Sequence, residues 1–152
     1  MAMFRGRYEH TVDPKGRLSI PAKFREVLLG KGDERLMITN FVVNSRRCLD
    51  VYPMDEWLRL EEAVGAKPKF ERRMVQFQNY YLGGAVECSV DPHGRVLIPS
   101  TLREYAGLKR NVMLVSAAEK FRIWDRGVWQ EVFNEAEAQL MEDPDSLDEL
   151  GL

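Results

Sequence analysis

The sequence predicts a mixed β fold with short helices, built from two ββ-α-ββ-α repeats that pack on each other around a pseudo-twofold axis. The main observation is an internal repeat: residues 13–21 read DPKGRLSIP, and residues 91–99 read DPHGRVLIP, 78 positions later. Apolar residues outside this motif also recur at similar offsets, so a whole supersecondary unit is duplicated. Each half has only about 50–60 residues, a size at which an isolated core is marginal, which favours one shared core.

The first repeat opens with a strand and a tight turn. Residues 4–12 alternate between two faces, which is the period of a half-buried strand. In the turn that follows, Pro14 presets φ, Gly16 permits positive φ, and the Asp13 carboxylate can accept backbone N–H groups. The repeat unit carries the same chemistry in its second copy. The predicted structural turn residues are therefore Asp13, Gly16, Asp91 and Gly94.

A return strand and a short helix come next. Residues 17–20 place Arg17 outward and the apolar side chains inward. Pro21 suits the first position of a helix, which Gly30 or Gly32 ends. The rest of this repeat is expected to be a hairpin and a second helix. The expected segments are a hairpin over 36–43 and 48–52 with its turn at 44–47, then a helix capped by Asp55.

A middle helix separates the repeats. Phe70, Met74, Phe77 and Tyr81 are spaced by 4, 3 and 4 residues, which predicts a helix with one apolar stripe. In the second repeat, Val86, Cys88 and Val90 are expected to face inward, Asp125 to cap the last helix, and residues 144–152 to fray. We expect four regions: repeat 1 at 4–64, a linker and middle helix at 65–81, repeat 2 with its C-terminal helix at 82–142, and an acidic tail at 143–152, with both repeats in one compact unit.

The net charge of −2 hides an uneven distribution. Residues 131–152 hold eight acidic residues and no Lys or Arg, which leaves 22 basic and 16 acidic residues elsewhere, a net charge of +6. The acidic segment is either a solvated helix or a tail that screens a basic surface. Both interpretations stay open at this stage.

Basic side chains gather around the repeated motif. Arg17 and Arg95 each follow a turn on the outer face of a strand, where the fold itself does not require them. An exposed arginine beside a tight turn is the alternative interpretation. A β-ribbon with such side chains on one face can enter the major groove, where guanidinium groups read guanine and ammonium groups contact phosphate. The predicted DNA-binding residues are Arg5, Arg7, Lys15, Arg17, Lys23, Arg25 and Arg95.

The two copies differ in charge. Residues 4–30 carry a net charge of +3, and the aligned residues 82–108 carry −1. Because phosphate attraction depends on the charges presented, we expect the first copy to hold DNA more strongly than the second. His93 replaces Lys15, so the second motif also lacks the lysine expected to contact phosphate.

Several motifs occur together along the chain: Phe4-Arg5-Gly6, both DxxxR motifs with their Ile-Pro exits, Glu71-Arg72-Arg73, Gly84 ahead of Glu87-Cys88, Tyr52-Pro53 with Trp57, and Trp124-Asp125. These residues carry a resemblance, over about residues 4–140, to the MraZ family, whose repeats belong to the AbrB-like, swapped-hairpin class of bacterial DNA-binding modules. It implies a double-split β-barrel and a transcriptional regulator that binds tandem repeats in double-stranded DNA, upstream of a cell-division and cell-wall gene cluster that includes its own gene. It also implies an octamer-like, ring-shaped homo-oligomer.

Other function classes have weaker support. An antitoxin-like or scaffold module that binds a protein partner is the second class, and the acidic tail would suit it. A hydrolytic enzyme is the third: His10, His93, Cys48 and Cys88 are its candidate groups, but the sequence contains no HxxxH, G-x-S-x-G or phosphate-binding loop. His10 is expected in the core.

No cofactor, metal or small-molecule substrate is expected. The two cysteines lack CxxC spacing, which suggests a reducing compartment and hence the cytoplasm. As an expected DNA-binding protein, the chain is also expected to be nucleoid-associated. No apolar run is long enough to cross a membrane, so no membrane partner is expected. Met1-Ala2 precede Met3, which is a second candidate start.

Overall fold

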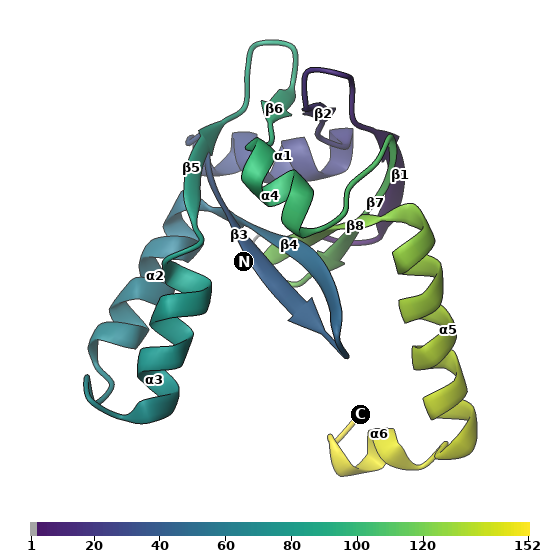
Figure 1. The fold of residues 1–152 in the computed structure, drawn as a ribbon. Helices are drawn as coiled ribbons and strands as arrows, with labels where there is room; N and C mark the ends of the chain where they lie inside the picture. The colour runs from purple at the N-terminus through teal and green to yellow at the C-terminus, as the bar shows by residue number, and fades with distance from the viewer. Residues whose placement is uncertain (1–2) are drawn as a thin grey trace.

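The computed structural model describes residues 3–152, so the question of Met1-Ala2 lies outside it. Strands of both repeats take part in one six-stranded sheet, and a second sheet of two strands joins the repeats again (Figure 1). The expected element order is present. The elements are β1 (Arg7–Thr11), β2 (Arg17–Ser19), α1 (Ala22–Lys31), β3 (Arg35–Val43), β4 (Arg46–Pro53), α2 (Met54–Gly65), α3 (Arg72–Phe77), the π-helical turn η1 (Gln78–Leu82), β5 (Val86–Ser89), β6 (Arg95–Leu97), α4 (Ser100–Tyr105), β7 (Asn111–Ala117), β8 (Lys120–Asp125), α5 (Arg126–Glu142) and α6 (Ser146–Glu149).

The six-stranded antiparallel sheet has the order β1-β7-β8-β4-β3-β5. Exchanging the repeats turns β1 into β5, β7 into β3 and β8 into β4, so the order maps onto itself about the β8–β4 pair. The first strand of each repeat pairs with a hairpin of the other repeat. The predicted mixed β fold with two related, swapped repeats is confirmed.

A separate two-stranded ribbon is formed by the segments that follow the two turns. β2 pairs antiparallel with β6, and Leu18 lies opposite Val96 at its centre. Both central side chains are buried and belong to a core that also contains Phe24, Phe121 and Leu102. Since this core draws on both repeats, neither repeat has a complete interior of its own.

The middle segment is fixed to the sheet by a buried polar network. The hydroxyl of Tyr81, in η1, donates a hydrogen bond to the carboxylate of Asp50, and the hydroxyl of Tyr52 lies 2.8 Å from that of Tyr81. The Nε of Arg122 donates to the other Asp50 oxygen at 2.8 Å. Asp50 is almost fully buried, and these partners satisfy its charge, which an apolar interior would otherwise disfavour.

The acidic C-terminal helix lies on the other side of the molecule from the ribbon. α5 begins at a cap formed by Asp125, as expected, whose side chain accepts the N–H groups of Gly127 and Val128. Glu131 and Glu135 both pair with Arg46, at 3.0 and 2.9 Å. The helix then runs away from the two turns (Figure 1), so within one chain it does not cover the β2–β6 ribbon. Residues 146–149 form α6, where fraying was expected.

Two predicted helix starts are wrong by one position or more. Pro21 is the N-cap of α1, with an extended ψ of 140°, so the helix begins at Ala22, one residue later than expected. Gly32 ends α1 with φ at 69°. Asp55 does not cap α2, which begins at Met54 after Pro53. Its carboxylate is already in the first turn and instead pairs with Nζ of Lys31 at 2.7 Å.

Three local expectations also fail. The first hairpin turns through two residues, Asn44 and Ser45, which both have positive φ, as two-residue hairpins require. The middle helix begins at Arg72, after a cap by Glu71, so Phe70 precedes it and is 96% exposed. Val86 is exposed because β5 is an edge strand that the core covers only at its far end.

No helix among residues 3–152 has the length and apolar character needed to span a membrane.

Candidate nucleic-acid interface

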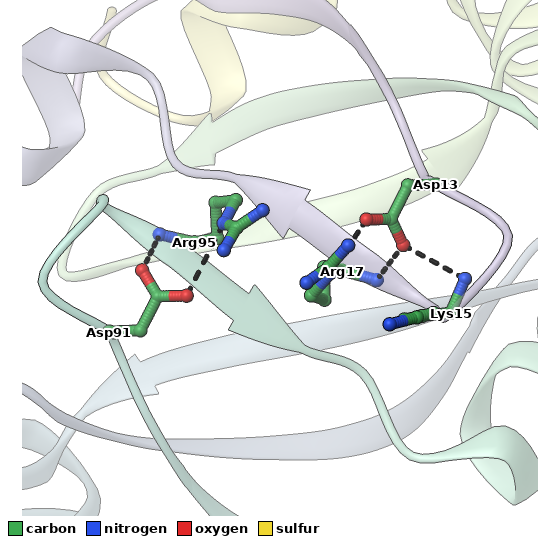
Figure 2. Close-up of polar contacts among 5 residues, drawn as sticks. All are labelled: Asp13, Lys15, Arg17, Asp91 and Arg95. Atoms are coloured by element: carbon green, nitrogen blue, oxygen red, sulfur yellow. Dashed lines mark hydrogen bonds and ion pairs between the residues drawn. The ribbon is translucent and has the colours of Figure 1, made fainter.

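The Asp13 carboxylate organises the first turn and holds Arg17. One carboxylate oxygen, Oδ1, accepts the backbone N–H groups of Lys15 at 3.0 Å and Arg17 at 2.9 Å. The other, Oδ2, accepts the Nε of Arg17 at 2.6 Å. The turn closes through the Gly16 N–H, which donates to the Asp13 carbonyl at 2.9 Å, with Gly16 at a φ of 90°. One side chain therefore shapes the turn and sets the direction of an arginine (Figure 2).

The second turn repeats this arrangement with its own residues. Asp91 accepts the N–H groups of His93 at 2.8 Å and Arg95 at 3.0 Å, and the Nε of Arg95 at 3.3 Å. Gly94 has a φ of 77°. The spacing of four residues between Asp and Arg in DxxxR thus has a structural reason. It lets the same carboxylate accept the N–H groups of the turn and pair with the arginine side chain.

Both turn carboxylates remain ionised at neutral pH. The pKa of Asp13 is lowered, mainly by the backbone N–H of Arg17, and the pKa of Asp91 is lowered mainly by the backbone N–H of Arg95. Hydrogen bonds to a carboxylate favour its charged form. Each turn therefore keeps a negative charge that holds its arginine in place.

Arg17 and Arg95 lie on the same exposed face of the β2–β6 ribbon. In the register, Arg17 is opposite Leu97 and Ser19 is opposite Arg95, while Leu18 and Val96 point into the core. About a third of each arginine side chain is exposed, 35% for Arg17 and 32% for Arg95. Figure 2 shows them side by side on neighbouring strands. Because each aspartate binds Nε, the terminal amino groups remain available for a ligand.

An arginine side chain of the other repeat packs against the glycine of each turn. A Cβ placed on Gly16 would lie 2.6 Å from Cζ of Arg103, and one on Gly94 would lie 2.6 Å from Nη1 of Arg25. The Nε of Arg103 donates to the Ile98 carbonyl at 2.9 Å. Reciprocal backbone hydrogen bonds of 2.9 Å join the two turns, from the N–H of Ile98 to Gly16 and from that of Ile20 to Gly94.

The structure places the predicted DNA-binding residues in three different settings. Arg17, Arg95 and the exposed Lys15 belong to the turns and the ribbon. Arg25 packs behind Gly94, and Arg7 points to the outer side of the sheet, 5.0 Å from the Phe133 ring centre. Of the other two, Arg5 is exposed ahead of β1, and Lys23 is exposed on α1 and lies 3.8 Å from Glu26.

The two motifs do not form separate surfaces, because the β2–β6 pairing puts Arg17 and Arg95 on one ribbon. The role of Arg103 was missed, although its alignment with Arg25 was visible in the sequence. Its contact with the opposite turn follows only from the exchange of hairpins between the repeats.

The two cysteines considered as nucleophiles for an enzyme lie in unreactive surroundings. Burial raises the pKa of the Cys48 thiol to about 12 and that of Cys88 to about 11. Both thiols are therefore neutral near pH 7, and a neutral thiol is a poor nucleophile. The Nδ1 of His10 donates to the Ser19 carbonyl at 2.7 Å, which links β1 to β2. Its side chain is half-buried and has a structural task.

Comparison with known proteins assigns the whole chain to one family. The MraZ family model, whose description calls the family antitoxin-like, matches residues 3–78 and 81–149. Over 150 residues, 99% of this chain and 100% of each relative, the sequence is 38% identical to a protein of Thermoanaerobacter sp. and 40% identical to one of Desulfitobacterium hafniense. It is 41% identical to a protein of Thioalkalivibrio sulfidiphilus over 84% of this chain and 83% of that relative. All three relatives are named Transcriptional regulator MraZ. The chain belongs to the MraZ family.

Proposed function

We propose that this protein regulates transcription by inserting the β2–β6 ribbon into the major groove of double-stranded DNA. The observation that carries the proposal is the ribbon's exposed face, where Arg17 and Arg95 are each held by an aspartate. A two-stranded ribbon fits the width of the major groove, and an arginine held at Nε still presents amino groups to guanine. The names of the relatives support regulation of transcription.

The Asp–Arg pairs suit recognition for a further reason. Arginine has several rotatable bonds, and fixing them when DNA binds costs conformational entropy. In this ribbon, the Asp13 and Asp91 carboxylates hold the guanidinium groups before DNA arrives. Pre-organised side chains lose less freedom on binding, so more of the contact energy appears as affinity and specificity.

The targets and assembly that we propose follow the family resemblance. The targets are tandem repeats upstream of a cell-division and cell-wall gene cluster that includes the protein's own gene, and the protein is cytoplasmic and nucleoid-associated. Self-association into a ring would place several ribbons on consecutive repeats and raise affinity through effective concentration. The exposed ring of Phe70 and the exposed Leu140 and Met141 on α5 supply apolar surface for contacts between chains.

Light scattering tests the assembly. We expect a mass well above that of one chain and a smaller mass for Phe70→Asp. The matched control is Leu29→Asp, since Leu29 is also exposed but lies on α1. A strict monomer at micromolar concentration, or equal effects of both substitutions, would count against this part of the proposal.

Binding to DNA is tested by fluorescence anisotropy with a duplex taken from upstream of the protein's own gene and a scrambled duplex of equal length. We expect tighter binding to the first duplex and a logarithmic affinity that falls linearly with the logarithm of the salt concentration. Failure to bind either duplex at low salt would refute the proposal and favour the antitoxin-like or scaffold alternative.

A further inference from the structure

A second basic segment, Lys109-Arg110, lies beside the first turn and belongs to the other repeat. The backbone N–H of Val12 donates to the Arg110 carbonyl at 2.8 Å, which holds the loop between α4 and β7 against the end of β1. Lys109 and Arg110 are exposed. Together with Asp13, Pro14 and Arg103, they line a surface depression of about 300 Å³.

The corresponding place beside the second turn carries the opposite charge. There, the N–H of Val90 donates to the Glu34 carbonyl at 3.0 Å, which is the same bond in the other repeat. Arg110 therefore corresponds to Glu34, and Lys109 corresponds to Asp33. The two ends of the ribbon thus have unlike neighbours: two cations at the first turn, and at the second the Glu34 carboxylate beside Asp33, whose charge is already paired with Arg35 at 2.7 Å.

The turns themselves add to this difference. The first turn carries the exposed Lys15, and the second carries His93 at the same position. The Asp13 carboxylate in the depression is already occupied by Arg17 and two backbone N–H groups. The charge left at the first-turn end is therefore positive, and it comes from both repeats.

We propose that Lys109 and Arg110 bind the DNA phosphate backbone beside the first turn and make that end of the ribbon the more tightly held one. The inference rests on the proposed DNA-binding function and adds a phosphate site and a direction to it. Guanidinium and ammonium groups bind phosphate oxygens, while the Glu34 carboxylate repels them. Each chain then lies on its half-site in one orientation, although its ribbon is nearly symmetric.

The salt dependence of binding tests this site. The variant is Lys109→Ala/Arg110→Ala, and the control is Lys67→Ala/Lys69→Ala, which removes the same charge from the segment between α2 and α3. Light scattering and thermal melting first establish that both variants keep the wild-type mass and Tm. The salt slope of DNA affinity is then measured for the wild type and both variants on the two duplexes described above.

We expect the slope of the Lys109→Ala/Arg110→Ala variant to fall by about 1–2 for each engaged chain, because each lost phosphate contact removes about 0.9. Affinity should fall by a similar factor for both duplexes, since phosphate contacts are insensitive to sequence. The control should keep the wild-type slope. If the wild type shows a steep slope and both variants match it, the phosphate site is refuted while the DNA-binding function stands. A wild type without salt-dependent binding refutes the function itself.

A scan of single methylphosphonate substitutions in the duplex identifies the ligand as backbone phosphate. We expect one or two positions on one side of each half-site at which the neutral phosphate weakens the wild type but has no further effect on the variant. Symmetric positions on both sides, or none, would overturn the proposed orientation.

Discussion

The guanidinium of Arg103, in the second repeat, packs directly behind Gly16, in the turn of the first. A Cβ on Gly16 would lie 2.6–2.8 Å from three atoms of that guanidinium group. Arg25 stands in the same relation to Gly94. Each DxxxR turn is thus completed by the opposite repeat, so the β2–β6 ribbon forms only when both repeats are folded together.

Replacement of Gly16 by alanine should therefore destabilise the protein. An alanine at a φ of 90° is strained, and its Cβ would also displace Arg103. We expect a loss of about 1–3 kcal/mol in the free energy of unfolding, measured by denaturant titration. Gly30→Ala is the control, because Gly30 has ordinary helical φ with nothing within 4 Å, and it should be neutral or stabilising by up to about 1 kcal/mol. Equal effects at both positions would contradict the packing argument.

Loss of the Asp13 carboxylate should weaken both folding and DNA binding. Asp13→Ala removes the acceptor of two turn N–H groups and releases Arg17. We expect a lower Tm together with lower affinity for the upstream duplex, and the same pattern for Asp91→Ala. If binding were lost while Tm stayed unchanged, the carboxylate would act on DNA directly and not through the turn.

The two ribbon arginines should differ in their contribution to binding. Arg17→Ala should cost about 1–3 kcal/mol of binding free energy per site if this arginine reads a base, and Lys15→Ala should lessen the salt slope by about one. Arg95→Ala should cost less, because Glu34 lies beside its turn, where the first turn has Lys109 and Arg110. Anisotropy titrations on one duplex compare the three variants after a melting check. An equal or larger loss from Arg95→Ala would show that flanking charge does not select the tighter end.

The buried hydroxyl of Tyr81 should contribute measurably to stability. Tyr81→Phe leaves Asp50 with Arg122 and removes the partner of the Tyr52 hydroxyl. We expect a loss of about 1–3 kcal/mol in the free energy of unfolding. Tyr80→Phe is the matched control: the Tyr80 hydroxyl bonds to that of Tyr105 in a partly buried place, so its removal should cost less. The reverse ranking would show that the network does not fix the middle segment.

Acid should destabilise the fold in a defined range. The Arg35 guanidinium and N–H lower the pKa of Asp33 from 3.8 to about 2, and hydrogen bonds also lower the pKa values of Asp13 and Asp91. A carboxyl group with a lowered pKa stabilises the folded state above the unfolded value, and this contribution is lost as the pH falls through the folded value. We expect Tm to drop between pH 4 and 2, with a shallower drop for Asp33→Asn. An unchanged pH profile in that variant would rule out its contribution.

The sequence allowed turns and helix ends to be predicted where residues close along the chain determine the structure. The DxxxR turns and the Asp125 cap depend on φ preferences and short-range hydrogen bonds, and both were predicted. The end of α1 was predicted at Gly30 or Gly32, and the structure places it at Gly32. The prediction that Asp55 caps α2 was wrong because Pro53 is the N-cap and the helix begins at Met54. The prediction that Phe70 belongs to the middle helix was wrong because helical spacing does not show where a helix begins, and the cap by Glu71 sets that start at Arg72.

The sequence by itself determined that a ββ-α-ββ-α unit occurs twice, that each copy closes a turn with an aspartate and a glycine, and that the copies differ in charge. Only the tertiary structure decided which residues of the other repeat lie beside each turn. The hairpins exchange between repeats, so Arg103 and Lys109-Arg110 of the second repeat lie beside the first turn, and Asp33-Glu34 of the first lie beside the second. The physical reason is that either half alone is too small to bury its apolar face, and the shared core that solves this places distant segments side by side.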